Sequence, residues 1–260
     1  MNAKDATRLY NVVVQAAHAR GMVFVNVSSA NASRIVAGES TPFCDAVSAA
    51  LDEFVTRAAK RYPAVQQAFV KTQLLKGADK WRTDSQLVLV LQQLDWAPKG
   101  TAVAPIAVCT FGAADAADRV FKDKELKRDV GDGRVLEIDF VGVLPDLRVD
   151  GSPPLTASFT TGTLLTLFVI ASQLKRRSRG APLFRAVVTS LAQTRDGVQT
   201  FAGVTKRLGF VNKAHSKGDG DLDVVALTHD KFKALDGKVH ADAIRDLCSL
   251  EPRSGKPRCI

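Results

Sequence analysis

The spacing of apolar residues along the chain predicts where helices and strands lie. Over residues 5–20, apolar side chains recur every three or four positions, which is the period of an amphipathic helix. A second helix is predicted over residues 41–62, because Thr41 can cap its start and Pro42 suits its first turn. A third helix is predicted to begin at Pro63. The start of the chain is therefore expected to be mainly helical.

Short runs rich in valine, leucine and isoleucine predict the strands of a sheet. In chain order, these runs occupy residues 22–28, 85–95, 105–112, 134–143, 183–191 and 223–229. The polar stretch between the third and fourth runs is predicted to be a connection that is partly helical. The fourth run, RVLEIDFVGV, is the clearest strand in the chain.

One segment, residues 162–177, is apolar on all sides and is predicted to be a buried helix. A loop rich in Pro, Gly, Ser and Thr precedes it, and the strand 183–191 follows it. Residues 134–191 therefore form a strand, a helix and a strand, which predicts a parallel pair with a right-handed crossover. The earlier strands have short or irregular connections and are expected to pair antiparallel. A further helix is predicted after Asp196 and ends at Gly209.

The chain shows no internal repeat and no clear domain boundary, so residues 1–260 are predicted to form a single domain. Within it we distinguish a mainly helical part (1–80), a core (81–230), and a short helix with a basic tail (231–260). The predicted class is α/β (α+β). It has a mixed, mostly antiparallel twisted sheet with a central parallel strand pair and helices on both faces.

Composition narrows the kinds of partner. The 260 residues are 46% hydrophobic and 24% charged, which is typical of a globular protein rather than a disordered one. The net charge of +9 favours polyanionic partners, which could be nucleic acid, a phosphate-rich cofactor or an anionic surface. Nucleic acid therefore stays a possible partner through the basic surface.

The cysteines and histidines indicate no metal site and no disulfide framework. The four cysteines include no C-x-x-C pair and no matching histidine pair, so we expect reduced thiols, with Cys109 a small buried residue. The chain shows no signal peptide, and no apolar run is long enough to span a bilayer. These features predict a soluble intracellular protein that does not enter a membrane.

Three motifs follow the clearest strand and resemble those of one superfamily. VLPDLR, with Val143, Pro145 and Arg148, resembles V-x-P-x-x-R of the GNAT superfamily, the acetyl-CoA-dependent N-acetyltransferases. TTGTLL is similar to the G-x-G-x-x-L that opens the following helix in that family, with Gly162 on the second glycine. KRLGF, which begins at Lys206, resembles the end of the helix after the fifth strand.

The resemblance implies a GNAT-like fold and acetyl-CoA as a co-substrate, which donates its acetyl group to an amine. Main-chain amides of Val141 and Val143 would bond the pantetheine arm where neighbouring strands splay. Amides at a helix start would receive the pyrophosphate, with added positive charge from an arginine. The implied pyrophosphate residues are Arg148, Thr160, Thr161, Gly162 and Thr163. The basic run after the buried helix could add charge, or it could simply be a solvated helix end.

Two carboxylates on the clearest strand are the candidate catalytic residues. Glu137 and Asp139 alternate with Leu136, Ile138 and Phe140, so both are predicted to face one side of the sheet. The resemblance implies that Glu137 or Asp139 acts as the base that deprotonates the amine, and it favours Glu137. The alternative is a solvent-facing polar row on a half-buried strand.

The chain also departs from the family pattern, and the departures leave three functions open. An insertion near residues 149–158 separates the two motifs, and Thr160 replaces the first glycine. The tyrosine that many family members use to protonate the leaving thiolate is replaced by Thr205, and Val198 replaces an asparagine. The chain could be an active N-acetyltransferase, a catalytically degenerate structural or interaction protein of the same fold, or a basic nucleic-acid-associated protein.

Overall fold

The structure is a computed structural model that describes residues 3–61, 86–93, 103–115, 124–130, 133–144, 154–175, 184–192, 200–215 and 222–228. Its helices are α1 (Ala3–His18), α2 (Ser29–Val36), α3 (Pro42–Arg61), α5 (Lys124–Val130), α6 (Pro154–Lys175) and α7 (Thr200–Arg207). Its strands are β1 (Met22–Val27), β2 (Gln86–Gln93), β3 (Val103–Asp115), β4 (Arg134–Val143), β5 (Ala186–Ala192), β6 (Val211–His215) and β7 (Leu222–Thr228).

The strands form one sheet of seven in the order β1-β2-β3-β4-β5-β7-β6. β1 to β4 pair antiparallel in chain order, and β5, β7 and β6 also pair antiparallel. The single parallel pair, β4 with β5, lies in the middle of the sheet. The predicted fold class is therefore confirmed: a mostly antiparallel sheet with one central parallel pair, in the strand order of a GNAT-like fold.

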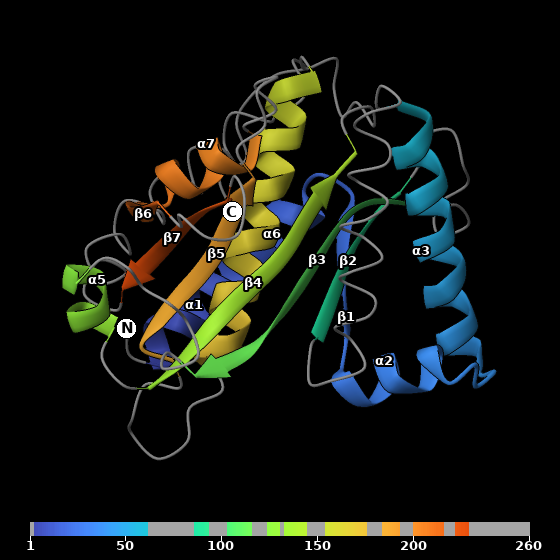
Figure 1. The fold of residues 1–260 in the computed structure, drawn as a ribbon. Helices are drawn as coiled ribbons and strands as arrows, with labels where there is room; N and C mark the ends of the chain where they lie inside the picture. Colours follow the sequence, from blue (N-terminus) through green and yellow to red (C-terminus); the bar gives the residue numbers. More distant parts are fainter. Residues whose placement is uncertain are drawn as a thin grey trace.

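Helices cover both faces of this sheet (Figure 1). On one face, α1, α6 and α7 enclose the largest apolar core together with side chains of β2, β3, β4 and β5. On the other face, α2 and α3 pack against β1, β2 and β3, and the Val130 end of α5 packs against β4, β5 and β7. This three-layer arrangement leaves the middle of β4 between two cores.

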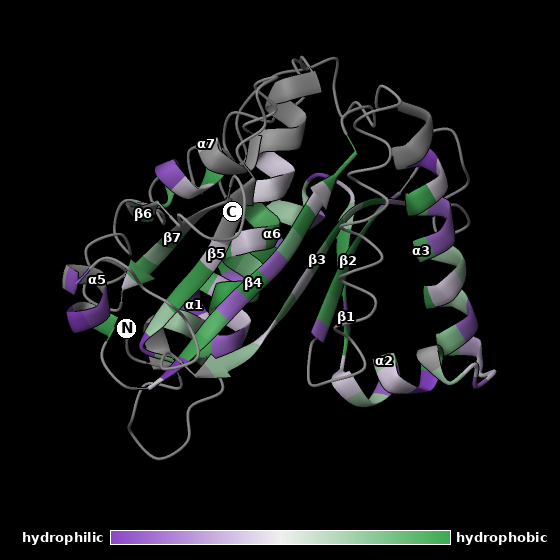
Figure 2. Cartoon of the chain, in the orientation of Figure 1, coloured by the Kyte–Doolittle hydropathy of each residue, from purple (hydrophilic) through white to green (hydrophobic). Residues whose placement is uncertain are grey.

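The buried helix α6 holds the first face together because it is apolar on every side. Residues 164–171 are buried almost completely. Figure 2 shows hydrophobic (green) segments along α6, whereas α3 alternates between green and purple. The Phe168 ring stacks on Phe24 of β1 with ring centroids 4.2 Å apart, and Tyr10 of α1 lies 5.3 Å from the same ring. α6 therefore joins the N-terminal helix and the edge strand to the centre of the sheet.

Several local predictions are confirmed, and two elements were missed. α3 begins at Pro42, and Thr41 caps it by accepting a hydrogen bond from the Cys44 N–H at 3.2 Å. Gly209 follows α7 with a φ of 78°, a conformation that suits glycine at a helix end. Helix α2 and strand β6 were not predicted from the sequence. The helix predicted from Pro63 and the C-terminal helix and tail lie outside the described residues.

The start of α6 differs from the prediction. The helix was predicted to begin at Gly162, but it begins at Pro154, so it takes in part of the segment that was predicted to be a loop. A proline fits the first helical position because its missing N–H has no partner there in any helix.

Candidate functional site

The centre of the sheet opens where β4 and β5 stop pairing. Their parallel ladder contains only the pairs Leu136–Val187, Glu137–Val188 and Ile138–Thr189. The Thr189 hydroxyl closes this ladder by donating to the Ile138 carbonyl oxygen at 2.8 Å. β4 continues to Val143, whereas the rest of β5 pairs with β7 on its other side. Among the described strands, the last five residues of β4 therefore pair on one edge only, with β3.

The free edge of β4 carries the two amides that the resemblance assigns to the pantetheine arm. Leu144, just after the strand, donates its N–H to the Ile106 carbonyl oxygen on the β3 side at 2.8 Å. Successive backbone amides of a strand point to opposite edges. The N–H groups of Val143 and Val141 therefore point away from β3, toward the opening between β4 and β5.

A β-bulge lies on β4 at the end of the parallel ladder. Phe111 pairs with Ile138 and Thr110 pairs with Phe140, so Asp139 is the inserted residue. Bulges bend a strand, leave one residue outside the ladder and re-aim its side chain. In this strand, the bulge interrupts the alternation of faces between Ile138 and Phe140.

The bulge corrects one prediction. Leu136, Ile138 and Phe140 were expected to share a face. Leu136 and Ile138 do lie in the core under α6, but Phe140 packs against the core under α2 and α3. The regular alternation used to place Glu137 and Asp139 on one side therefore does not extend through Asp139. Glu137, between Leu136 and Ile138, points to the face opposite these two residues.

Both candidate catalytic carboxylates are half-buried, Glu137 within the β4–β5 ladder and Asp139 just beyond its end. Glu137 is in register with Gly112 of β3 and Val188 of β5. Asp139 lies close enough to Cys109 for its charge to matter: burial raises the pKa of the Cys109 thiol well above its usual value, and the Asp139 carboxylate raises it further. Cys109 itself is fully buried, as predicted, and stays a thiol.

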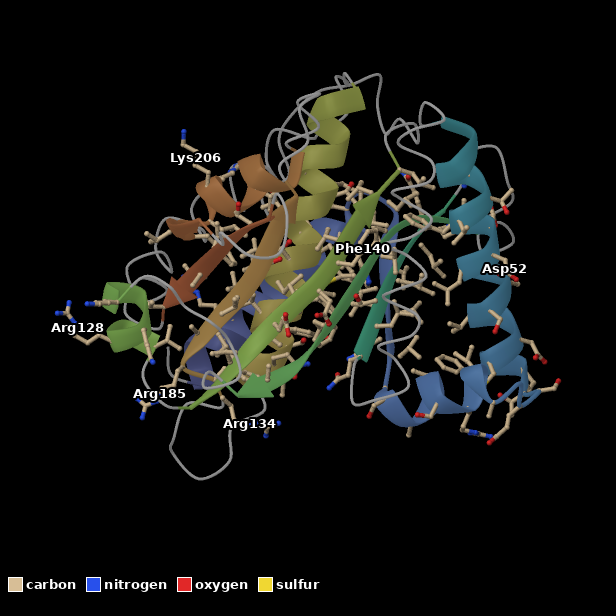
Figure 3. The ribbon with its side chains drawn as sticks, in the orientation of Figure 1. Asp52, Arg128, Arg134, Phe140, Arg185 and Lys206 are labelled. Atoms are coloured by element: carbon tan, nitrogen blue, oxygen red, sulfur yellow. The ribbon has the colours of Figure 1, made fainter. Side chains whose placement is uncertain are left out.

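Two aromatic rings pack against Gly142 on the α3 side of β4. A Cβ added to Gly142 would lie 2.7 Å from Cε1 of Phe140 and 3.2 Å from Cζ of Phe54 on α3. Figure 3 labels Phe140 on β4. Glycine at position 142 therefore lets the Phe140 ring lie flat against the strand.

The residues predicted to hold the pyrophosphate lie inside α6 rather than at its start. Thr160, Thr161, Gly162 and Thr163 are more than one helical turn from Pro154, so their amides are within the helical ladder. The Thr166 hydroxyl donates to the Gly162 carbonyl oxygen at 2.8 Å, as in a helix interior. The prediction that these four residues form a helix N-terminus is therefore wrong.

The new start of α6 offers few amides to an anion. The first four N–H groups of a helix have no partner within the helix. Two of these four positions are Pro153 and Pro154, which have no N–H, so only Leu155 and Thr156 can donate. Arg148 and Pro145, which the resemblance assigns to the same loop, lie outside the described residues.

Two further predicted features can be placed. Thr205, at the position of the expected tyrosine, is 2% exposed within α7, so its hydroxyl is not at the protein surface. Among the described residues, no three His, Cys, Asp or Glu side chains gather closely enough to hold a metal ion. In the same part of the chain, no helix combines the length and hydrophobicity needed to cross a bilayer.

Comparisons with known proteins give similarities of fold only. No family model matches the sequence, and no curated protein matches it either. Among solved structures, Arabidopsis thaliana NAA60 with a bisubstrate analogue is 15% identical, with 80% of this chain and 98% of that chain covered and a TM-score of 0.43. The complex of NAA60 with acetyl-CoA is 14% identical, with 80% of this chain and 99% of that chain covered and a TM-score of 0.41. A Desulfovibrio desulfuricans protein named for the GNAT family of acetyltransferases is 16% identical. The match covers 80% of this chain and 98% of that chain, with a TM-score of 0.36.

The strand order and the single splayed parallel pair define the class: a divergent α/β protein with the GNAT-like fold. Because the matched structures are so distant in sequence and shape, we derive the function from the residues of this chain.

Proposed function

We propose that this protein binds acetyl-CoA in the opening between β4 and β5 and transfers the acetyl group to an amine. The observation that supports this most directly is the end of the β4–β5 ladder at Ile138, beyond which the Val141 and Val143 amides point into the opening. Unpaired main-chain donors need partners when they are covered. The amide groups of an extended pantetheine arm, lying like an added strand, supply such partners.

The transfer reaction requires a base and a group that polarises the thioester carbonyl. Glu137 and Asp139, half-buried at the end of the ladder, are the base candidates for the attacking amine. The β4 amides beyond the bulge are also positioned near the opening, and a main-chain N–H stabilises the negative charge that develops on the carbonyl oxygen.

The pyrophosphate needs a different receptor from the one that the motif resemblance implies. With α6 starting at Pro154, we assign this role to the amides of Leu155 and Thr156 together with Arg148. Two amides form a weaker anion site than a complete helix start. We therefore expect the adenosine diphosphate part to contribute less to affinity than the pantetheine arm.

Calorimetry with acetyl-CoA and one backbone substitution tests the proposal. Val143→Pro removes an N–H that points into the opening and leaves the β3 side of the ladder intact. One net hydrogen bond is worth about 1 kcal/mol, so we expect roughly a 5- to 10-fold weaker Kd. Val143→Ala is the matched control, because it trims the side chain and keeps the N–H. Equal affinity for the wild type and Val143→Pro, or no binding at millimolar acetyl-CoA, would contradict the proposal.

A second candidate function is a catalytically degenerate interaction protein of the same fold. The two prolines at the start of α6 and the buried Thr205 in place of a tyrosine both favour it, because each removes a group that the reaction uses. A panel of amines with a thiol-release assay separates the two functions. Binding of acetyl-CoA without thiol release from any amine would favour the degenerate protein.

A further inference from the structure

A buried hydroxyl without a protein partner lies next to the bulge on β4. Thr110 of β3 is 2% exposed, and no group in the described part of the chain makes a hydrogen bond with its Oγ1. A buried polar atom left in this state costs free energy, so native proteins nearly always give it a partner, either a protein group or an ordered water. The exception at Thr110 requires a physical reason.

The position of Thr110 suggests that reason. Thr110 is in register with Phe140, immediately next to the inserted Asp139, so one carboxylate and one unpartnered hydroxyl lie on neighbouring strands. The same point is the end of the β4–β5 ladder, where the sheet begins to open. A bulge also leaves the backbone of its extra residue outside the ladder. These groups together provide the two to four polar partners that a buried water needs.

We propose that Thr110 is a positioning residue whose hydroxyl holds a water between the acceptor amine and Asp139. This role rests on the proposed acetyl transfer. As the amine nitrogen bonds to the acetyl carbon, the carbon–sulfur bond breaks and the sulfur leaves as a thiolate. The proton on the nitrogen passes to the water, and a proton of that water passes to the Asp139 carboxylate. Thr110 is unchanged in this step, and it fixes the water in line between donor and acceptor.

The same geometry assigns the base. Glu137 lies within the paired part of β4, between Gly112 and Val188, whereas Asp139 is the inserted residue next to Phe140, the register partner of Thr110. Asp139 is therefore the proton acceptor in this scheme, and Glu137 is not required for it.

Two substitutions at position 110 separate the hydroxyl from the side-chain shape. Thr110→Val keeps the volume and removes the hydroxyl, and Thr110→Ser keeps the hydroxyl. We expect Thr110→Val to lower kcat by 10-fold or more with little change in the KM for acetyl-CoA, because it acts on the transfer step and not on binding. Thr110→Ser should retain kcat within about threefold. Unchanged kcat in Thr110→Val would overturn the proposal, as would an equal loss in both variants.

A second readout does not depend on activity. If Thr110 and Asp139 share a water, the effects of Thr110→Val and Asp139→Asn on Tm are coupled. We expect Thr110→Val to lower Tm by about 2–4 °C in the wild type and to leave it unchanged in the Asp139→Asn background. If the hydroxyl is simply unpartnered, Thr110→Val raises Tm by a similar amount in both backgrounds, and the proposal is wrong. If the protein does not bind acetyl-CoA, the proposed function and the proton transfer through the water are both wrong. The Tm measurements in the two backgrounds would still show whether Thr110 and Asp139 share a water.

Discussion

The two halves of β4 belong to one strand but have different surroundings. From Arg134 to Ile138, the strand pairs with β3 on one edge, and it pairs with β5 from Leu136 to Ile138 on the other; the side chains of Leu136 and Ile138 are buried under α6. From Asp139 to Val143, it carries a bulge, pairs with β3 alone, and every residue is half-buried. The first half closes the core, and the second half borders an opening.

This difference shows which part of β4 has a backbone edge that a ligand can reach. From Leu136 to Ile138, both edges of the backbone are paired in the sheet, so a ligand would have to displace a strand. In the second half, no described strand lies beside one edge, and a ligand can take that place without breaking any described ladder pair. A substitution in the first half should therefore affect stability, and one in the second half should affect binding.

The largest expected effect tests this division directly. Ile138→Ala removes a side chain that is 1% exposed and should lower the free energy of unfolding by roughly 2–5 kcal/mol. Val141→Ala trims a half-buried side chain in the open half and should cost clearly less, roughly 1 kcal/mol. Urea denaturation of both variants measures the difference. Equal losses at the two positions would show that the open half is as closely packed as the paired half.

The sequence predicted the first half of β4 better than the second. The bounds 134–143 were predicted correctly because a polar stretch ending in Gly133 precedes the apolar run and Pro145 follows it closely. The bulge could not be predicted, because it depends on the register with β3, and register is a property of two strands. The end of the β4–β5 ladder was expected from the family resemblance, not from the apolar pattern.

The misplaced start of α6 has a simpler cause. Residues 154–161 are rich in threonine and serine, which favour loops and caps, so the helix was predicted to begin at Gly162, where the apolar run begins. Pro154 was an available signal, since proline is common at a first helical position. α2 was missed because its SANASRIV sequence has few apolar residues, although Ser28 is a recognisable cap that accepts from the Asn31 N–H at 3.3 Å.

A second, smaller effect should follow from the thiol opposite the open half. Cys109 is in register with Val141, and burial, with the nearby Asp139 charge, raises its pKa. The folded protein therefore holds this proton more tightly than the unfolded chain does. The contribution to stability is complete below the unfolded thiol pKa of about 8.5 and is lost as the pH rises from there toward the folded pKa.

Cys109→Ala tests that contribution through the pH dependence of unfolding. Above about pH 8.5, the wild type should lose up to about 1.4 kcal/mol per pH unit more than Cys109→Ala, since one proton is released on unfolding. Val108→Ala is the packing control, because Val108 is buried on the same strand and does not titrate. Parallel pH curves for the wild type and Cys109→Ala would show that the thiol does not titrate differently in the two states.

The smallest effect separates two views of Gly162. If this glycine lies at a helix start against a pyrophosphate, as the family motif implies, an added Cβ should block acetyl-CoA. In the structure, Gly162 is inside α6, and an added Cβ would lie 3.5 Å from Cγ2 of Val204 and 3.7 Å from Cγ2 of Val143, which are ordinary contact distances. Gly162→Ala should therefore raise the free energy of unfolding by about 0.5–1 kcal/mol, because alanine favours a helix interior.

Calorimetry with acetyl-CoA on the same variant then tests whether the ligand contacts α6 near Gly162. With the pantetheine arm against the Val141 and Val143 amides, the acetyl-CoA affinity of Gly162→Ala should stay within about twofold of the wild type. A large loss of affinity in a variant that is more stable would mean that the ligand reaches the middle of α6.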